Sequence, residues 1–336
     1  MSLRVAINGY GRIGRNILRA LYENKGPHDI EIIAINDLGD LEINTHLTRY
    51  DSVHGPSSFA VSSTDDGIQI ESNFIKYLQH KEPEDLPWGD LGIDLVFECT
   101  GRFTSKEKTS NHLKSGAKRV LVSAPCTNAD ATIVYGVNHQ TLTNNHRVIS
   151  NASCTTNCLA PLADVIHQAQ HIKSGIMTTI HAYTNDQHLS DVNSGDPYRS
   201  RAAAISMIPT KTGAAAAVGL VLPELNNKLS GLAVRVPTPN VSLVDLTYQP
   251  DIQLTAEEIN ILIKNAANTD FSGIINCNEA PLVSVDFNHN PASCIFDCTQ
   301  THVCNGLTKV FAWYDNEWGF SNRMIDLATY ISNNLD

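Results

Sequence analysis

A glycine-rich turn near the start of the chain constrains the fold more than any other feature. Gly9, Gly11 and Gly14 have the spacing Gly-x-Gly-x-x-Gly, directly after an apolar run at 4–8 and before an amphipathic stretch at 12–22. A strand, a glycine turn and a helix in this order are typical of a dinucleotide-binding unit, because glycine lets the backbone approach a pyrophosphate. The motif alone is weak evidence, since such a turn can also be purely structural.

An acidic residue at the end of the second apolar run strengthens this interpretation. The run at 30–36 leads directly into Asp37, where a carboxylate that binds the ribose hydroxyls is expected about 20 residues after the glycines. A 2′-phosphate would meet a like charge there, so the sequence favours NAD over NADP. The alternative is that Asp37 only caps the following turn.

Strand-like and helix-like segments alternate through the first half of the chain. Helices are expected at 12–22 and 106–115, between strands predicted at 4–8, 30–36, 94–98, 119–123, 132–135 and 148–150. This alternation predicts an α/β fold with a doubly wound parallel sheet of the Rossmann type.

The pattern changes after about residue 152. Longer strands are expected at 176–181, 232–236, 241–248 and 309–314, and a terminal helix from 321 to about 333. We therefore expect an NAD-binding domain at 1–152, completed by the C-terminal helix within 317–336. An α+β domain with a mixed or antiparallel sheet is expected at 153–316.

Composition excludes several classes of protein. Of the 336 residues, 42% are hydrophobic and 18% charged, with no run long enough to span a membrane and no signal peptide, so we expect a cytoplasmic protein. The net charge of −11 argues against a surface that binds nucleic acids or membranes.

The eight scattered cysteines do not indicate a disulfide framework. Cys294, Cys298 and Cys304 are interpreted as buried structural residues, and no metal site is predicted.

Cys154 is the candidate nucleophile. The segment 150–158, Ser-Asn-Ala-Ser-Cys-Thr-Thr-Asn-Cys, leads from a predicted strand into a helical stretch at 159–168. The helix dipole favours the thiolate form of a thiol at a helix N-terminus, and a thiol with a pKa of about 6 would be mostly ionised at neutral pH. Cys158, one turn later, is expected to be buried and inert. His181 closes an apolar strand and is one of 13 histidines that could act as the base.

Six segments resemble the glyceraldehyde-3-phosphate dehydrogenase family. They span nearly the whole chain and read INGYGRIGR, SNASCTTNC, HAYTNDQ, IPTKTGAAAAVG, RVPTPNVSLVDL and WYDNEWGFSNR. The resemblance implies that Cys154 attacks an aldehyde, that His181 is the general base, and that a thioester is released by inorganic phosphate. It also implies a homotetramer in which the loop at 186–201 reaches a neighbouring subunit.

The resemblance further assigns the binding residues. The substrate phosphate would be held by Thr184, Arg199 and Arg235, and the attacking phosphate by Ser153, Thr155, Thr212 and Gly213. For Arg235 a structural salt bridge is the alternative, and for Thr212 a helix cap. The cofactor would be bound by Gly9, Gly11, Arg12, Ile13, Gly14, Asp37, Thr100, Gly101, Ser123 and Asn316.

Some positions depart from this pattern. Stretches at 86–88, 134–138 and 285–289 look like the non-phosphorylating erythrose-4-phosphate dehydrogenase, which leaves that substrate as an alternative. Val192-Asn193 stands where NAD-specific relatives usually carry Leu-Pro, so some tolerance of NADP is possible. A cysteine–histidine acyl hydrolase would leave the glycine turn unexplained. A non-catalytic NAD-binding or redox-sensing protein would need only the reactive thiol.

Overall fold

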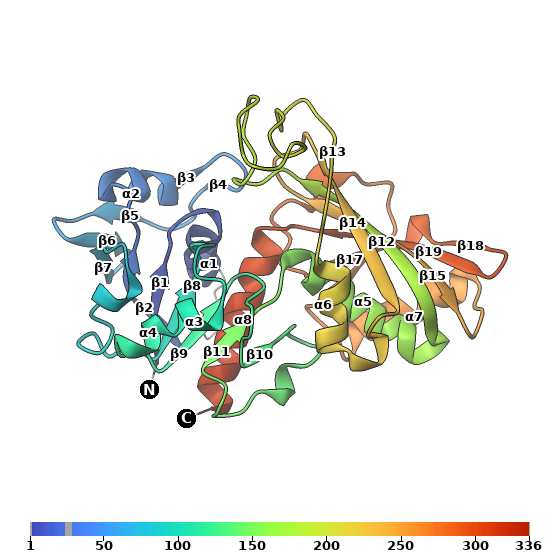
Figure 1. Ribbon diagram of the computed structural model, residues 1–336, viewed down its shortest axis with the longest axis horizontal. Coiled ribbons are helices and arrows are strands. Elements are labelled where there is room, and N and C mark those ends of the chain that lie inside the picture. Colours follow the sequence, from blue (N-terminus) through green and yellow to red (C-terminus); the bar gives the residue numbers. More distant parts are fainter. Residues whose placement is uncertain (1, 24–28, 336) are drawn as a thin grey trace. The chain divides into compact units, whose positions relative to one another are not determined.

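The computed structural model describes residues 2–23 and 29–335. It divides the chain into two compact units, each with its own sheet (Figure 1). Unit 1 comprises Met1–Ser153 and Ser321–Asp336, and unit 2 comprises Cys154–Phe320. The two units are described separately below.

Unit 1 contains the expected parallel sheet. Its strand order is β10-β11-β9-β8-β1-β2-β7-β6-β5, and the pairs from β10 through β7 are parallel. The α/β fold class is thereby confirmed. The parallel strands are β1 (Leu3–Asn8), β2 (Ile30–Asn36), β7 (Asn73–Leu78), β8 (Leu95–Glu98), β9 (Arg119–Val122), β10 (Ala131–Thr132) and β11 (Val148–Ser150).

One edge of this sheet is antiparallel, which the sequence pattern did not predict. β6 (Gly67–Ile70) pairs antiparallel with both β7 and β5 (Val61–Ser63). Glu71, between β6 and β7, adopts a positive φ of 51°. Such a tight turn joins neighbouring strands directly and leaves no room for a crossover helix.

Two other predicted elements differ in extent. The strand expected at 132–135 ends at Thr132, because the Val134 amide donates to the side chain of Asn138 instead of a neighbouring strand. The helix expected over 106–115 is divided into α3 (Lys106–Thr109) and α4 (Asn111–Lys114). The division falls at Ser110, which ends α3 and begins α4.

The remaining elements of unit 1 surround the sheet. The core on one side of it contains Trp88, Val96, Val120 and Val148, all fully buried. The further elements are α1 (Arg12–Glu23), α2 (Leu41–Arg49), β3 (Tyr50–Asp51), β4 (Gly55–Pro56), η1 (Pro83–Asp85) and η2 (His139–Thr141). The terminal helix α8 spans Trp318–Asn334.

Unit 2 contains a mixed sheet. β12 (Ile172–Ala182) pairs in parallel with β14 (Leu229–Val236) and antiparallel with β15 (Ser242–Pro250). The sheet order is β13-β14-β12-β15-β19-β17-β16, with β18 beside β19. The other strands are β13 (Ile208–Thr210), β16 (Ile275–Asn278), β17 (Cys294–Asp297), β18 (His302–Cys304) and β19 (Leu307–Tyr314).

Helices of unit 2 pack on this sheet. The central helix α5 (Cys154–Gln170) contacts β12, β15, β17 and β19. α7 (Ala256–Asn268) was missed by the sequence analysis, although Thr255 and Glu258 form a complete capping box at its start. The other elements are α6 (Ala214–Val221), η3 (Pro223–Leu225), η4 (Ser284–Phe287) and η5 (Cys298–Gln300).

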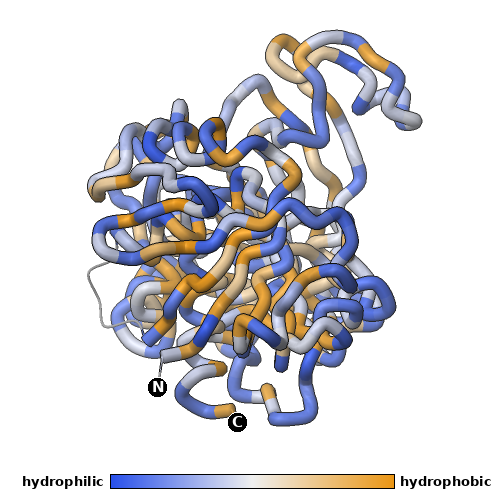
Figure 2. Tube along the Cα trace, turned by 90° about the vertical axis from the view of Figure 1, so that its left-hand side faces the viewer, coloured by the Kyte–Doolittle hydropathy of each residue, from blue (hydrophilic) through white to orange (hydrophobic). Residues whose placement is uncertain are grey.

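Apolar and polar stretches alternate along the chain trace (Figure 2). Within residues 2–23 and 29–335, no helix has the length and apolar character needed to cross a membrane.

Candidate active site

Cys154 is the first residue of α5. Ala152, two residues earlier, is buried with a positive φ of 55°, which turns the chain from β11 into the helix. The helix N-terminus directs backbone N–H groups, among them those of Cys154 and Thr155, toward the sulfur. Cys158, the second cysteine of this helix, is fully buried, as expected, and its Sγ lies 3.9 Å from the carbonyl oxygen of Ala312.

His181 faces Cys154 from β12. Its Nε2 lies 3.5 Å from the Cys154 Sγ, while its Nδ1 lies 2.6 Å from the carbonyl oxygen of Ala182. Nδ1 also lies 3.2 Å from Arg235 Nη1, which only donates, but its shorter contact is with a carbonyl oxygen, which only accepts. We therefore place the hydrogen on Nδ1 and the lone pair on Nε2, which faces the thiol. The structure therefore brings together the two residues predicted to be catalytic, with the imidazole in the tautomer that a base requires.

Burial dominates the proton affinity of both groups. Burial raises the pKa of the Cys154 thiol above its ordinary value, although the Arg235 charge and hydrogen bonds from Thr155 oppose this. Burial and the nearby charge of Arg235 lower the pKa of His181 to about 4. The expectation that Cys154 is a thiolate at neutral pH is therefore wrong. The proton stays on sulfur, opposite a neutral imidazole that can accept it.

A buried hydroxyl cluster lies behind this pair and was missed by the sequence analysis. The Tyr314 hydroxyl is 2.8 Å from both the Thr155 and the Thr179 hydroxyl oxygens. The Tyr314 ring also packs edge-on against His181, with 6.0 Å between the ring centres. These contacts link the first turn of α5 to the strand that carries the base. They also engage the hydroxyl of Thr155, which was expected to bind phosphate.

Arg235 lies beside His181, its neighbour across the parallel pair β12–β14. Its Nη1 donates to the Ala182 carbonyl oxygen at 3.0 Å and to the Thr184 hydroxyl at 2.9 Å. Both partners are neutral oxygens, so no salt bridge accounts for this arginine. Its Nε is buried and has no partner among the described residues. An incoming anion would supply the missing acceptor.

Arg199 and Thr184 meet at the same carboxylate. Arg199 forms an ion pair of 2.5 Å with Asp186 and donates to the Thr210 hydroxyl at 3.0 Å, and Thr184 donates its hydroxyl to Asp186. Together with the contact from Arg235 to Thr184, these bonds gather the three residues predicted to hold the substrate phosphate. Asp186 was not predicted, and nothing in its sequence context identified it.

Thr212 and Gly213 lie at the start of α6, which packs against α5. The Thr212 hydroxyl accepts from the Ala214 amide at 3.2 Å, but the N-cap residue of α6 is Gly213, so Thr212 is not the helix cap that the alternative assumed. Ser153 directly precedes α5 and is half-buried. The role of these residues in holding phosphate stays a prediction.

Asn316 is buried and is tied to the strand of the base through Ser242. The Ser242 hydroxyl donates to the Asn316 side-chain oxygen at 2.8 Å and accepts from the Ala182 amide at 3.1 Å. This chain fixes the orientation of the Asn316 amide group. Ser242 was not predicted, because a serine in a strand carries no distinctive signal.

The glycine turn of unit 1 has the shape that a dinucleotide requires. A Cβ at Gly9, where φ is +91°, would lie 2.6 Å from the Thr100 amide nitrogen, and one at Gly14 would lie 2.3 Å from the Gly9 carbonyl oxygen. At Gly11 the same test meets no atom within 4 Å. Two glycines thus allow close packing within the protein, and the third faces open space that a pyrophosphate could fill.

Asp37 holds this turn in place. Its carboxylate accepts from the Tyr10 amide at 2.7 Å and from the Gly39 amide at 2.8 Å. Asp37 therefore does cap this turn, as the alternative interpretation proposed, and it also lies at the cavity. Asp37 lines a cavity of about 250 Å³ together with Gly9, Gly11 and Thr100, and with the unpredicted residues Asn8, Asn36, Leu38, His80, Lys81, Cys99, Arg102 and Phe103.

The other residues predicted to bind the cofactor surround the same strand ends. Arg12 begins α1 and forms an ion pair with Asp51, and Ile13 follows it, half-buried. Burial raises the pKa of Asp51, but bonds from Arg12 and from the amides of His54 and Val53 outweigh it and lower the pKa to about 2. Gly101 has a φ of +69° with open space around it, and Ser123 donates its amide to the Glu98 carbonyl at 3.0 Å.

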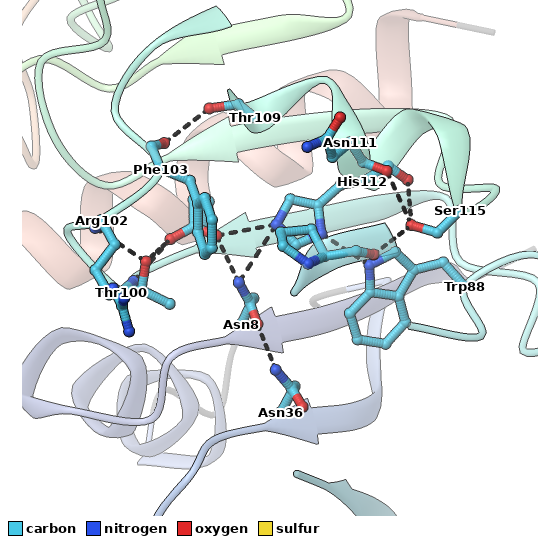
Figure 3. Close-up of polar contacts among 12 residues, drawn as sticks. Asn8, Asn36, Trp88, Thr100, Arg102, Phe103, Thr109, Asn111, His112 and Ser115 are labelled. Carbon is cyan, nitrogen blue, oxygen red and sulfur yellow. Dashed lines mark hydrogen bonds and ion pairs between the residues drawn. The ribbon is translucent and has the colours of Figure 1, made fainter. Parts of the chain in front are cut away.

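A buried network supports the Thr100 side of this cavity (Figure 3). The Glu98 carboxylate accepts from the Asn8 side chain at 2.6 Å and from the Thr100 amide at 2.8 Å, and its Oε2 lies 3.0 Å from His112 Nε2. Trp88, fully buried, donates its indole N–H to His112 Nδ1 at 2.9 Å. Trp88 thus has a structural role in this network.

Comparison with known proteins agrees with this geometry. Residues 3–106 match the family described as glyceraldehyde 3-phosphate dehydrogenase, NAD binding domain, and residues 153–316 match its C-terminal domain. The plasmid glyceraldehyde-3-phosphate dehydrogenase of Cupriavidus necator is 59% identical over 333 residues, 99% of each chain. Those of Pseudomonas aeruginosa and Geobacillus stearothermophilus are 56% and 50% identical, over 98% and 99% of each chain. The predicted resemblance is confirmed, and the chain belongs to the glyceraldehyde-3-phosphate dehydrogenase family.

Proposed function

We propose that this chain is a phosphorylating glyceraldehyde-3-phosphate dehydrogenase that oxidises glyceraldehyde 3-phosphate to 1,3-bisphosphoglycerate, a reaction of glycolysis. One observation carries the mechanism: the Cys154 sulfur lies 3.5 Å from His181 Nε2, the imidazole nitrogen that bears the lone pair. This pair can make a sulfur nucleophile and then accept a second proton, which are the two tasks of thioester formation from an aldehyde.

The first step is attack of Cys154 on the aldehyde carbon. His181 Nε2 takes the thiol proton as the carbon–sulfur bond forms, and it returns this proton to the former carbonyl oxygen. The N-terminal amides of α5 stabilise the negative charge on that oxygen before the proton arrives. The product of this step is a thiohemiacetal on Cys154.

The second step oxidises this carbon. NAD, when bound, supplies the acceptor for the hydride. His181 takes the hydroxyl proton of the thiohemiacetal, so that electron density moves toward the carbon as it is oxidised to the thioester. We assign Asn316 to hold the nicotinamide carboxamide, because the bonds through Ser242 fix its amide.

The third step transfers the acyl group to inorganic phosphate. We assign the attacking phosphate to Ser153, Thr155, Thr212 and Gly213, of which the last two lie at the start of α6. A phosphate oxygen attacks the thioester carbon, the Cys154 sulfur leaves, and it regains its proton from His181. The acyl phosphate is then released.

The substrate's own phosphate is assigned to Arg235, Arg199 and Thr184. The support is the charge of the two guanidinium groups and the buried Arg235 Nε, which lacks an acceptor. When the phosphate binds, Asp186 has to share or yield its bonds to Arg199 and Thr184. The phosphate then replaces one anionic acceptor with another of higher charge.

NAD is assigned to unit 1, with Gly9, Gly11, Gly14 and Asp37 around the turn. Arg12, Ile13, Thr100, Gly101 and Ser123 complete the site at the neighbouring strand ends. The charge of Asp37 disfavours the 2′-phosphate of NADP. Asn193 lies on an exposed loop, at a position where NAD-specific relatives usually carry proline, and we propose that it allows some use of NADP.

We further propose a cytoplasmic homotetramer. Large apolar side chains are exposed on the sheet of unit 2 and on the segment after β12, including Ile176, Leu189, Leu232, Ile205 and Met207, at 44% to 82%. Burial of such side chains between subunits would remove their contact with water. Sedimentation equilibrium of the purified protein tests this, and a monomer at micromolar concentration would overturn it.

A steady-state assay tests the function. Glyceraldehyde 3-phosphate and erythrose 4-phosphate are each supplied with NAD or NADP, with and without phosphate or arsenate. We expect NADH formation from glyceraldehyde 3-phosphate to rise strongly when phosphate or arsenate is added. Phosphate-independent turnover with a preference for erythrose 4-phosphate would overturn the assignment.

A further inference from the structure

A pair of thiols lies at the far edge of the unit 2 sheet, outside the site described above. Cys277 is on the edge strand β16, and Cys298 is the first residue of η5, directly after the neighbouring strand β17. Both side chains are half-buried, although Cys298 was expected to be buried, and both thiols are free. The mechanism proposed above uses neither of them.

Strand pairing places the two cysteines on one face. In the parallel register of β16 and β17, Cys277 lies opposite Phe296, and side chains two residues apart point the same way. Cys298 therefore follows Phe296 on the face that carries Cys277, as its diagonal neighbour. Diagonal neighbours across a strand pair lie within reach of one another. β16 and η5 are in contact, and each of the two thiols shifts the pKa of the other.

The neighbours of Cys298 favour its thiolate on balance. Cys277 and the positive charge of Lys264 lower the pKa of Cys298, and they outweigh burial and the negative charges of Glu279 and Asp297, which raise it. Lys264 is oriented there by an ion pair with Glu279. A thiolate next to a lysine and a second thiol is the arrangement that makes cysteine reactive toward disulfides.

Small molecules can approach from a surface cavity. Cys277, Lys264 and Glu279 line a cavity of about 490 Å³ together with residues of α7 and η4. This volume is comparable to that of pockets for drug-sized ligands, about 300–1,000 Å³. Cys277 is thus accessible from the cavity, and Cys298, which does not line it, is itself partly exposed.

We propose that Cys277 and Cys298 form a dithiol modification site that reacts with low-molecular-weight disulfides and closes to an intramolecular disulfide. The Cys298 thiolate attacks one sulfur of the small disulfide, which forms a mixed disulfide and releases one small thiol. Cys277 then attacks the Cys298 sulfur of this mixed disulfide, which releases the second small thiol. Two protein thiols are oxidised and one small disulfide is reduced, so electrons and protons balance.

Other thiols of the unit lack this combination of contact and access. Cys158 and Cys294 also influence each other, since Cys294 raises the pKa of Cys158, but both are fully buried. Cys304 is exposed on β18, contrary to the expectation that it is buried. It provides a matched control, because it has access to solvent but lies outside the pair.

Peptide mapping of the full-length protein tests the proposal. The protein is treated with oxidised glutathione, blocked with iodoacetamide and digested before each aspartate, which gives fragments 270–285 with Cys277 and 297–314 with Cys298 and Cys304. We expect these two fragments to be joined by a disulfide, and dithiothreitol to separate them. The state of Cys154 is read from its own fragment, 130–163.

Single substitutions assign the sulfurs. Cys298→Ser and Cys277→Ser should each lower the joined product by at least about tenfold, because one step of the exchange is then missing. Cys304→Ser should leave it unchanged. A joined product that survives Cys298→Ser, or a stable glutathione adduct on Cys298 with no joined product, would overturn the proposal.

Discussion

Substitution of His181 by asparagine removes the proposed base and leaves a side chain of similar size. His181 Nε2 is the imidazole nitrogen that faces the Cys154 sulfur, at 3.5 Å, and its lone pair is available because Nδ1 donates to Ala182. Asparagine keeps a polar side chain but cannot accept a thiol proton at neutral pH. The thiol proton and later the thiohemiacetal proton would then have to pass to water.

The size of the effect follows from the protonation state of His181. At pH 7, about three pH units above a pKa of about 4, nearly every molecule carries the neutral imidazole, so the whole benefit of the base is present in the wild type. A positioned general base contributes about 10²–10⁴ in rate, or about 3–5.5 kcal/mol of transition-state stabilisation. We therefore expect kcat/KM for glyceraldehyde 3-phosphate to fall by that factor.

The pH profile provides a second readout. The neutral imidazole is the active form, so a lowered pKa keeps His181 active as the pH falls, and kcat/KM of the wild type should decline only near pH 4. A histidine with an unperturbed pKa of about 6.5 would lose its activity much earlier. In His181→Asn the acid limb that belongs to this group should disappear.

A matched control separates this effect from a general loss of structure. His302→Asn makes the same chemical change at an exposed position of β18, and it should leave kcat/KM within about twofold of the wild type. Thermal unfolding confirms that both variants are folded. A His181→Asn enzyme within tenfold of the wild type, or with an unchanged acid limb, would refute the assignment of the base.

Four further substitutions test the binding residues. Asp37→Asn should narrow the preference for NAD over NADP by about tenfold or more, since it removes the charge that repels a 2′-phosphate; an unchanged ratio of the two kcat/KM values would count against that role. Arg235→Gln should raise the KM for glyceraldehyde 3-phosphate by about 10–100-fold through loss of a charge-assisted bond, and it should raise the pKa of His181, whose depression it shares. Gly9→Ala should lower the free energy of unfolding by about 1–3 kcal/mol, because its Cβ would lie 2.6 Å from the Thr100 nitrogen. Gly11→Ala, with no atom within 4 Å, should leave stability unchanged and weaken NAD binding, as measured by denaturant titration and calorimetry.

The elements with a strong local signal could be predicted from the sequence. The strand at 30–36 and the helix from Arg12 form as expected, because buried parallel strands are continuous apolar runs and the first helix is amphipathic. The pattern failed where side chains compete with the backbone or where a turn replaces a helix. Asn138 ends β10 early, and the turn at Glu71 produces the antiparallel edge.

The candidate active site also contains residues that could be predicted from the sequence and residues that could not. Cys154 and His181 could be proposed from residue type and position, and the structure brings them together. Tyr314, Ser242 and Asp186 could not, since each acts through a contact with a residue distant in sequence or on a loop. The protonation state was mispredicted for a physical reason. The helix N-terminus favours thiolate, but burial of Cys154 opposes it more strongly, and burial is not visible in the sequence.

The central claim is that the aldehyde is oxidised while it is bound to the Cys154 sulfur. The most direct test mixes the enzyme with glyceraldehyde 3-phosphate and NAD, without phosphate, and stops the reaction with acid. Fragment 130–163 is then analysed by mass mapping. We predict an acyl adduct on Cys154 that accumulates without phosphate, disappears when phosphate is added, and is absent in Cys154→Ser. Turnover with no adduct at residue 154, or full activity of Cys154→Ser, would contradict the account.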